Sequence, residues 1–404
     1  MYAVRKVKRH QKELRALKFA EALEFDNSRD FFAEVKKMTP KPSLTDCING
    51  EEGDDAIAKH FNLKYQALYN SVASDQNEME NIIDSVNRSI CNCNDCDFII
   101  DTNDVMSAVQ KLKSGKTDGD VGYNSSHLLY GSQLYFHHLS CLFTSMYIHG
   151  HQASPLLNAT IVSIPKDYSK SLEVDSNYRG IALCCSISKL YDLIMLARNS
   201  DFLSTSHNQF AFKKEMGTTM CSLILKEVVQ HYLNNDSHVY ACFLDASKAF
   251  DRVRYDQLFK ALINRGVQPP DLRLLLDQYL NQQCRASWKG QNSSYFKINN
   301  GIRQGSIASP LLFCVYLDSL LDELEQKGIG CWVGNHYYGA LVYADDIVLV
   351  SPTAHGLKQM VRTCEVFCDR SDMQFNPNKS VCICFRRKKH MTYPDIKMGD
   401  TSLK

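Results

Sequence analysis

The sequence is poor in the residues that interrupt regular structure, with 19 glycines and 10 prolines in 404 residues. This composition, with 44% hydrophobic residues, excludes long disordered tracts and predicts a folded chain. No apolar run approaches the roughly 18 residues that a membrane span needs. An apolar N-terminal segment is also lacking, so the 16 cysteines indicate free thiols in a reducing, intracellular compartment. The sequence does not distinguish nucleus from cytoplasm.

The chain also lacks an excess of charge of either sign, since its formal net charge is +1. A strongly basic balance, which favours general binding to nucleic acid, is therefore absent. Basic residues nevertheless gather in residues 1–18 and 386–390. Each cluster is either a solvated face or a surface for phosphates. The chain is long enough for one large core or for two to three subdomains.

Two adjacent carboxylates, Asp345 and Asp346, lie between two apolar runs of strand length within residues 341–350. The pattern predicts a buried β-hairpin with both acids at its turn. Neighbouring anions repel each other, which raises the pKa of one of them unless a cation lies between them. Mg²⁺ suits this position, because it binds oxygen ligands from one or two carboxylates together with substrate phosphates. Ordinary Asp-Asp turn chemistry is the alternative interpretation.

A second apolar strand, in residues 240–245, ends in Asp245. Three segments then resemble, in the same order, motifs A, B and C of the reverse transcriptases of non-LTR (LINE-type) retrotransposons. They are FLDASKAFD at 243–251, GIRQGSIASPLLF at 301–313 and YADD at 343–346. The resemblance extends over residues 55–385.

The resemblance implies an α/β (α+β) fold with the fingers and palm of a right-hand polymerase, in which helices back an antiparallel palm sheet. We expect a helical N-terminal extension or linker in residues 1–100 and fingers in 101–235. The palm with its catalytic motifs is expected in 236–390 and a truncated C-terminal tail in 391–404. The thumb of the family is expected to be missing or truncated, because few residues follow the palm.

Local patterns add details to this plan. Charged, helix-forming sequence predicts helices within residues 11–37, and apolar periodicity predicts another over 55–69. The polar residues 70–98 are expected to form a loose connection. Alternation predicts a hairpin over 285–298 with its turn at Gln291-Asn292. Strands that alternate with helices predict a palm sheet with helices on one face.

The chemistry implied by the resemblance is nucleotide addition, a displacement served by two divalent ions about 3.5–4 Å apart. We expect two Mg²⁺ ions, or Mn²⁺, with Asp245 and Asp345 as bridging ligands. Asp346 is expected to position the ion that activates the primer. Lys379, in a segment that resembles motif D, is the implied proton donor to pyrophosphate, with an ordinary turn lysine as the alternative.

The resemblance assigns the triphosphate of the incoming nucleotide to Lys166 and Arg179, since an ammonium and a planar guanidinium both suit phosphate oxygens. Two exposed bases on a hairpin are the alternative. Phe250, five residues after Asp245, is implied to exclude a 2′-hydroxyl and so to favour deoxynucleotides. A core aromatic ring at a junction between a strand and a helix is the alternative there.

The segment that resembles motif B is expected to approach the nascent base pair. Gly305 allows close approach of the backbone, and the Gln304 amide can form hydrogen bonds. Arg303 is expected to contact either a template phosphate or an internal acid.

The function implied is that of an RNA-directed DNA polymerase (reverse transcriptase), which binds an RNA template, a DNA primer and deoxynucleoside triphosphates. A truncated or repurposed relic, which binds nucleic acid with weak or no catalysis, is the first alternative. An RNA-dependent RNA polymerase is the second, and Phe250 and Ala344 argue against it. No membrane is expected as a partner, and protein partners are not indicated.

Overall fold

The structure is a computed structural model that describes residues 44–118, 122–386 and 395–403. The helices predicted within 11–37, the basic cluster 1–18 and most of the cluster 386–390 lie outside these residues. The described residues fall into two compact units. The smaller contains residues 44–50 and 165–177, and the larger contains the rest.

The smaller unit contains the strand β1 (Cys47–Ile48) and the 3₁₀ turn η2 (Asp175–Asn177). Hydrogen bonds join its two segments: the backbone N–H of Asn49 donates to Glu173 O at 2.8 Å, and that of Asp175 donates to Asn49 Oδ1 at 3.2 Å. Asn49 has a φ of 49°, a conformation that asparagine tolerates better than most residues.

Most helices of the larger unit begin or end at residues that favour such ends. The helices of this unit are α3 (Asp54–Leu68), α4 (Gln76–Ile90), η1 (Asp95–Phe98), α5 (Thr102–Gln110), α6 (Ser125–Leu129), α7 (Gln133–His149), α8 (Ser154–Leu157), α9 (Ser186–Arg198), α10 (Thr218–Asn234), η3 (Ala249–Arg252), α11 (Tyr255–Asn264), α12 (Pro269–Asn281), α13 (Ser309–Gln326) and α14 (Ala354–Ser371). Gly266, for example, follows α11 with a φ of 80°, a backbone conformation that ends helices and favours glycine. None of the described helices combines the length and apolar character that a membrane span requires.

Residues 70–98 are not a loose connection, because α4 occupies much of this segment. The Asp75 side chain accepts from the backbone N–H of Glu78 and so caps the helix. Met79, Ile82 and Val86 are buried on the face that α4 turns toward α11 and α12. The polar composition hid an amphipathic helix with a narrow apolar stripe.

One sheet of the larger unit has the strand order β4-β3-β6-β7, with β8 also paired to β6. Its strands are β3 (Asn158–Pro165), β4 (Tyr178–Cys184), β6 (Gln283–Trp288), β7 (Gln291–Asn292) and β8 (Phe296–Lys297). Helix α3 packs on β6, where the rings of Phe61 and Trp288 stack with centroids 5.3 Å apart. The predicted turn at Gln291-Asn292 is wrong, since these residues pair with Trp288 and Ser287. The turn lies at Lys289-Gly290, whose φ values of 44° and 90° suit a tight hairpin.

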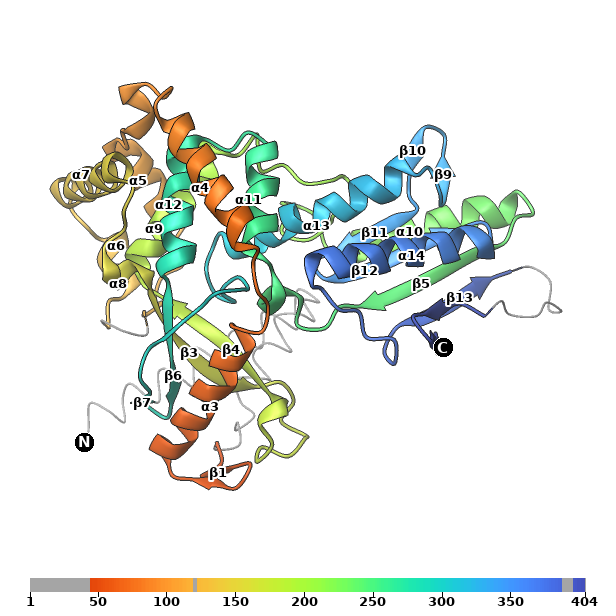
Figure 1. The fold of residues 1–404 in the computed structure, drawn as a ribbon, viewed down its shortest axis with the longest axis horizontal. Helices are drawn as coiled ribbons and strands as arrows, with labels where there is room; N and C mark the ends of the chain where they lie inside the picture. The colour runs from red at the N-terminus through yellow and green to blue at the C-terminus, as the bar shows by residue number, and fades with distance from the viewer. Residues whose placement is uncertain (1–43, 119–121, 387–394, 404) are drawn as a thin grey trace, which may run out of the picture. The chain divides into compact units, whose positions relative to one another are not determined.

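The second sheet is antiparallel throughout and has the order β11-β12-β5-β13 (Figure 1). Its strands are β5 (Val239–Asp245), β11 (Ala340–Tyr343), β12 (Asp346–Ser351) and β13 (Val381–Phe385). We call it the catalytic sheet, because it carries the three predicted catalytic aspartates at one end. The remaining short strands are β2 (Glu51–Glu52), β9 (Trp332–Val333), β10 (His336–Tyr337), β14 (Lys397–Met398) and β15 (Thr401–Ser402).

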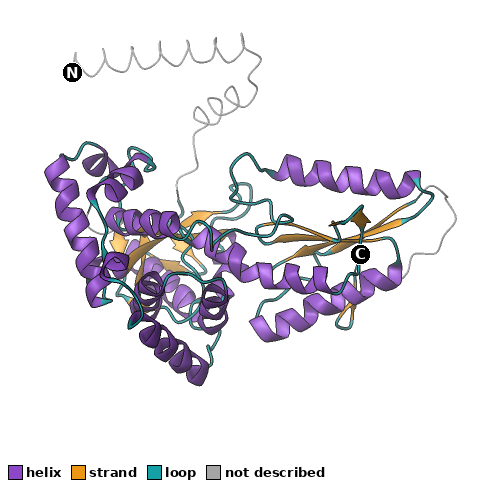
Figure 2. Cartoon of the chain, turned by 90° about the horizontal axis from the view of Figure 1, so that it is seen from above, coloured by secondary structure: helices purple, strands orange, loops and turns teal. Residues whose placement is uncertain are grey.

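Helices lie on both sides of the catalytic sheet, not on one (Figure 2). Val228 and Val229 of α10 pack against Val239 and Val350, which share one face of the sheet. Helix α14 packs against β5 and β12, and α13 contacts β11. The mixed fold with an antiparallel sheet backed by helices is thus confirmed, whereas the boundaries of fingers, palm and tail stay predictions.

Candidate active site

Three aspartates lie at one end of the catalytic sheet. The register of β5 and β12 places Asp346 directly opposite Asp245, so their Cα atoms are about 4.5–5.5 Å apart, as in any antiparallel pair. Asp345 is in the turn that precedes β12. Residues separated by a hundred positions in the sequence therefore meet at the same end of the sheet, as the sequence predicted.

The turn that carries Asp345 has a conformation that is unusual for its residues. Tyr343 pairs with Asp346, which leaves Ala344 and Asp345 as a two-residue turn. Ala344 has a φ of 58°, in the left-handed region that costs a residue with a Cβ roughly 1–2 kcal/mol. The Gln209 side chain holds it there, since Gln209 Oε1 accepts from the backbone N–H of Ala344 at 3.0 Å.

The electrostatics of this end of the sheet favour a cation. Burial raises the pKa of Asp345 above its ordinary value, and the charges of Asp346 and Asp245 raise it further. The Arg179 guanidinium opposes this shift and lowers the pKa of Asp345. Asp345 is half-buried and Asp346 is exposed, so a ligand from solvent can reach the acids.

Lys379 also lies at this site, in the loop that leads into β13. Its Nζ is 3.4 Å from Oδ2 of Asp245, and its side chain is 66% exposed. Two hydrogen bonds hold the loop beside the strand end: Asn376 N–H donates to Asp245 O at 2.8 Å, and Asp245 N–H donates to the side-chain Oγ of Ser380 at 3.2 Å. The segment that resembles motif D is thus hydrogen-bonded to the strand that resembles motif A.

The two predicted phosphate-binding bases lie in different units. Arg179 is exposed on β4 of the larger unit, and its charge lowers the pKa of both Asp345 and Asp251. Its charge therefore acts on Asp345 at the end of the catalytic sheet. Lys166 belongs to the smaller unit, where its Nζ donates to Ser176 O at 2.8 Å.

The loop that resembles motif B is held against β4. Ala182 N–H donates to Gln304 O at 2.8 Å, and a Cβ at position 305 would lie 2.1 Å from Ala182 O. Glycine is thus required at 305, where φ is 138°. The side chain of Gln304 turns toward η3, in the segment that resembles motif A, since its Nε2 donates to Asp251 Oδ1 at 2.9 Å.

Phe250 and Arg303 have clear packing environments. The ring of Phe250 stacks on that of Phe313 with centroids 4.2 Å apart, and Phe250 remains half-buried while Phe313 is buried. Arg303 is 4% exposed and donates through Nη1 to Leu157 O at 3.2 Å. Arg303 is therefore internal, where its hydrogen bond goes to a main-chain carbonyl and its charge lowers the pKa of the buried acid Asp192. Whether it contacts a template phosphate or an acid stays a prediction.

Asp192 is a site-supporting residue that the sequence prediction missed. It is buried on α9 and accepts from Ser306 Oγ at 2.6 Å and from the backbone N–H of Ile307 at 3.0 Å. It thereby fixes the residues that follow Gln304 and Gly305. An acid inside an apolar helix (190–196, LYDLIML) was the available signal, because a buried carboxylate needs partners.

The donor chemistry of the aspartate cluster fits a hard divalent cation, since Asp245, Asp345 and Asp346 supply oxygens only. Within the residues that the structure describes, no group of at least three His, Cys, Asp or Glu side chains converges closely enough to hold a metal by itself. Mg²⁺ ordinarily binds through one or two carboxylates and takes its other ligands from substrate phosphates and water.

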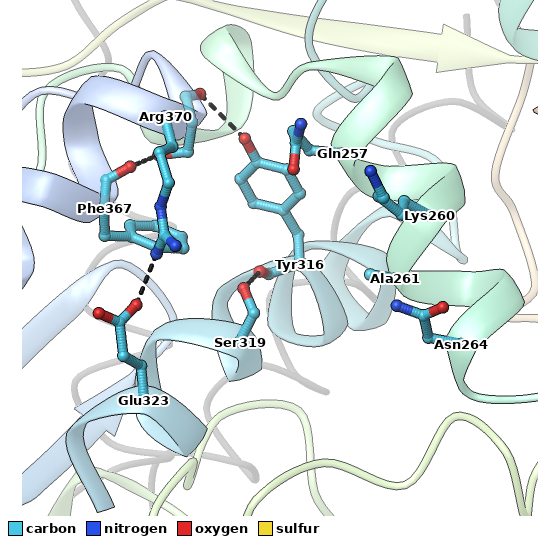
Figure 3. Close-up of a pocket in the computed structure, with 10 residues that line it drawn as sticks. Gln257, Lys260, Ala261, Asn264, Tyr316, Ser319, Glu323, Phe367 and Arg370 are labelled. Atoms are coloured by element: carbon cyan, nitrogen blue, oxygen red, sulfur yellow. Dashed lines mark hydrogen bonds and ion pairs between the residues drawn. The ribbon is translucent and has the colours of Figure 1, made fainter. Parts of the chain in front are cut away.

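A separate pocket of about 230 Å³ lies between α11, α13 and α14 (Figure 3). None of the predicted site residues lines it. Arg370 Nη2 donates to Glu323 Oε2 at 2.5 Å across its rim, and Tyr316 Oη donates to Ser371 O at 2.9 Å. Four of the lining residues are thus paired with one another, whereas Lys260 Nζ pairs with Glu78 Oε1 at 2.9 Å, outside the lining.

Comparisons with known proteins agree with the motifs. A family model described as reverse transcriptase (RNA-dependent DNA polymerase) matches residues 164–397. The chain is 28% identical over 239 residues to a retrovirus-related Pol polyprotein from type-1 retrotransposable element R2 of Popillia japonica, which covers 58% of this chain and 33% of that protein. It is 28% identical over 250 residues to a probable RNA-directed DNA polymerase from transposon BS of Drosophila melanogaster, with 57% and 26% covered.

Among solved structures, telomerase from Candida tropicalis in complex with a fragment of telomeric RNA has a TM-score of 0.43 at 14% identity. The match covers 63% of this chain and 45% of that chain. A TM-score this low transfers no structural detail. The chain spans about a third or less of the length of the curated relatives.

Proposed function

Because this chain belongs to the reverse transcriptase (RNA-dependent DNA polymerase) family, we propose that it adds deoxynucleotides to a DNA primer on an RNA template. The observation that carries the proposal is the register of β5 and β12, which sets Asp346 opposite Asp245 with Asp345 in the adjoining turn. Such a cluster serves phosphoryl transfer, in which the protein mainly positions its substrates and stabilises charge.

Divalent ions, Mg²⁺ or Mn²⁺, would be held by Asp245, Asp345 and Asp346. Reverse transcriptases generally use divalent metal ions. When bound, they would stabilise the negative charge that develops on the attacking and leaving oxygens. The raised pKa of Asp345 supports this assignment, because burial and the two neighbouring acids disfavour its charged form until a cation is present.

Basic side chains are proposed to act on the triphosphate. Arg179 is close enough to Asp345 to lower its pKa, so it would hold phosphate oxygens beside the carboxylates. Lys166 is proposed as a second phosphate ligand. The ion pair of Lys379 with Asp245 supports Lys379 as the proton donor to pyrophosphate.

Gln304 and Gly305 are proposed to contact the incoming nucleotide. The close approach of Gly305 to Ala182 ties their loop to β4, which also carries Arg179. Phe250 is proposed to lie beneath the sugar and to exclude a 2′-hydroxyl, since the ring is half-buried and its stack on Phe313 fixes its plane.

Primer extension tests the function. The protein is given an RNA template, a DNA primer, Mg²⁺ and deoxynucleotides, and the lengths of the products are measured, with Asp345→Asn as the matched inactive control. Extension by the wild type alone is expected. Absence of extension by well-folded wild type would favour the alternative function, a relic that binds nucleic acid without catalysis. Extension only with ribonucleotides on an RNA primer would indicate an RNA-dependent RNA polymerase.

The role of Phe250 has its own test. In Phe250→Ala, the discrimination between a deoxynucleotide and its ribonucleotide is expected to fall about tenfold or more, because the steric block to the 2′-hydroxyl is removed. The measurement is the ratio of kcat/KM for the two nucleotides. Phe313→Leu, which keeps the ring of Phe250 but removes its stacking partner, should lower the discrimination by less. Unchanged selectivity in Phe250→Ala would show that the ring is a core residue only.

A further inference from the structure

Asp251 connects three segments that are far apart in the sequence. It is 7% exposed and follows the strand that resembles motif A. Its Oδ1 accepts from Gln304 Nε2 at 2.9 Å, and its carboxylate also accepts a hydrogen bond from the hydroxyl of Tyr69, the C-cap residue of α3. Its main-chain oxygen accepts from Asn300 Nδ2 at 2.7 Å. The charged groups that face it are Lys248 and Arg179.

The contact between Asp251 and Gln304 sets the direction of an amide. An ionised carboxylate can only accept hydrogen bonds, so the amide must present its NH₂ group to Asp251. Oε1 of Gln304 then points to the other side, and no donor to it is present in the described part of the chain. Gln304 therefore offers an acceptor to whatever binds beside it.

We propose that Asp251 is a positioning residue, which fixes the side-chain amide of Gln304 so that its oxygen, and not its nitrogen, faces the incoming nucleotide. This inference rests on the proposed function, in which Gln304 contacts that nucleotide. The substrate group that matches Gln304 is thus a hydrogen-bond donor. Tyr69 assists from α3, because its hydroxyl stabilises the ionised form of Asp251 on which the arrangement depends.

The arrangement should respond to pH. Burial raises the pKa of Asp251 to about 6, although the hydrogen bonds from Gln304 and Tyr69 and the charges of Lys248 and Arg179 lower it. Above this pH the carboxylate accepts from Gln304. Below it the protonated acid carries its own O–H donor, and the amide is free to turn. The KM for the nucleotide should therefore rise as the pH falls through about 6.

The experiment measures kcat and KM for a deoxynucleoside triphosphate from pH 5 to 8 with wild type, Asp251→Asn and Tyr69→Phe. In Asp251→Asn, the KM is expected to rise about tenfold at pH 7.5 with a smaller change in kcat. The reason is that an asparagine side chain can pair with the Gln304 amide in either of its two orientations. Its KM should also lose the dependence on pH near 6.

Tyr69→Phe keeps the carboxylate and provides the second test. Removing a hydrogen bond to the ionised form raises the pKa of Asp251, so the rise in KM should begin at a higher pH than in wild type. Tyr65→Phe is the matched control, because its hydroxyl on the same helix bonds to Ser163 Oγ at 2.8 Å. It should leave the profile unchanged.

The outcomes separate this inference from the proposed function. Extension by wild type with the same KM profile in Asp251→Asn would overturn the inference alone, and so would an unshifted profile in Tyr69→Phe. Absence of extension by folded wild type would overturn the proposed function and this inference with it. A merely structural role predicts a lower Tm for Asp251→Asn at pH 7.5, whereas the positioning role predicts an equal or higher Tm together with the raised KM.

Discussion

The aspartates of the larger unit differ according to where their partners lie. Asp192 and Asp318 are buried and have partners within the fold: Asp192 accepts from Ser306 Oγ at 2.6 Å, and Asp318 accepts from Arg265 Nη2 at 2.7 Å. At the end of the catalytic sheet, among the described residues, the only ion pair of the three aspartates joins Asp245 to Lys379. Acids that serve the fold have internal partners, whereas this cluster is proposed to take its cations from solution.

Asp345→Asn would test the open cluster most directly, and the largest effect is expected there. The rate of extension should fall by more than about 10³-fold, because a ligand for the metal ions is lost. The free energy of unfolding should stay unchanged or rise, since a partly buried, repelled charge is removed. Single-nucleotide extension and urea unfolding measure the two quantities. A large loss of stability would mean that Asp345 belongs with the internally paired acids.

Asp192→Ala tests the opposite class. Removal of this carboxylate leaves Ser306 Oγ and the backbone N–H groups of Ile307 and Ala308 without their acceptor in a buried site. The free energy of unfolding is expected to fall by about 4 kcal/mol. Urea unfolding at pH 7.5 measures it.

The control for Asp192→Ala is Asp322→Ala, which removes an exposed acid from α13 and should change the stability by less than about 0.5 kcal/mol. A cost for Asp192→Ala as small as this would show that the loop after Gly305 holds its shape without Asp192. The distinction between the two classes of acid would then fail at this position.

Asp251 lies between the two classes, because it is buried and yet near the cluster. Burial raises its pKa from 3.8 to about 6, so the folded state binds its proton more tightly than the unfolded state. Stability is therefore highest below the unfolded pKa and falls as the pH rises toward 6. This difference in pKa corresponds to a loss of about 3 kcal/mol in the free energy of unfolding over that pH range.

Asp251→Asn removes this dependence. Its stability relative to wild type should improve by up to about 3 kcal/mol between pH 4 and pH 7. Thermal unfolding at several pH values measures the difference, with Asp322→Ala again as the control. A constant difference across this range would show that the carboxylate of Asp251 does not titrate there.

The sequence predicted the open cluster better than the internal pairs. Asp345 and Asp346 are adjacent between two apolar runs of strand length, and the resemblance to motifs A and C links them to Asp245. The partners of Asp192 and Asp251 come from segments more than 50 residues away, as for Ser306 and Gln304. No local sequence pattern reveals a contact between residues so far apart in the chain. Helix α4 was missed for the same reason, because its few apolar residues are buried only by contact with α11 and α12.

Lys379→Gln gives the smallest change in stability, and it shows what the ion pair at the cluster contributes. Because Lys379 is 66% exposed, loss of its pair with Asp245 should cost less than about 0.5 kcal/mol in urea unfolding. Extension should nevertheless slow about 10²-fold if the lysine donates a proton to pyrophosphate. Lys358→Gln, an exposed lysine on α14, is the control and should change neither quantity. A variant that extends at the wild-type rate would leave Lys379 as an ordinary turn lysine, and the cluster would then depend on its metal ions alone.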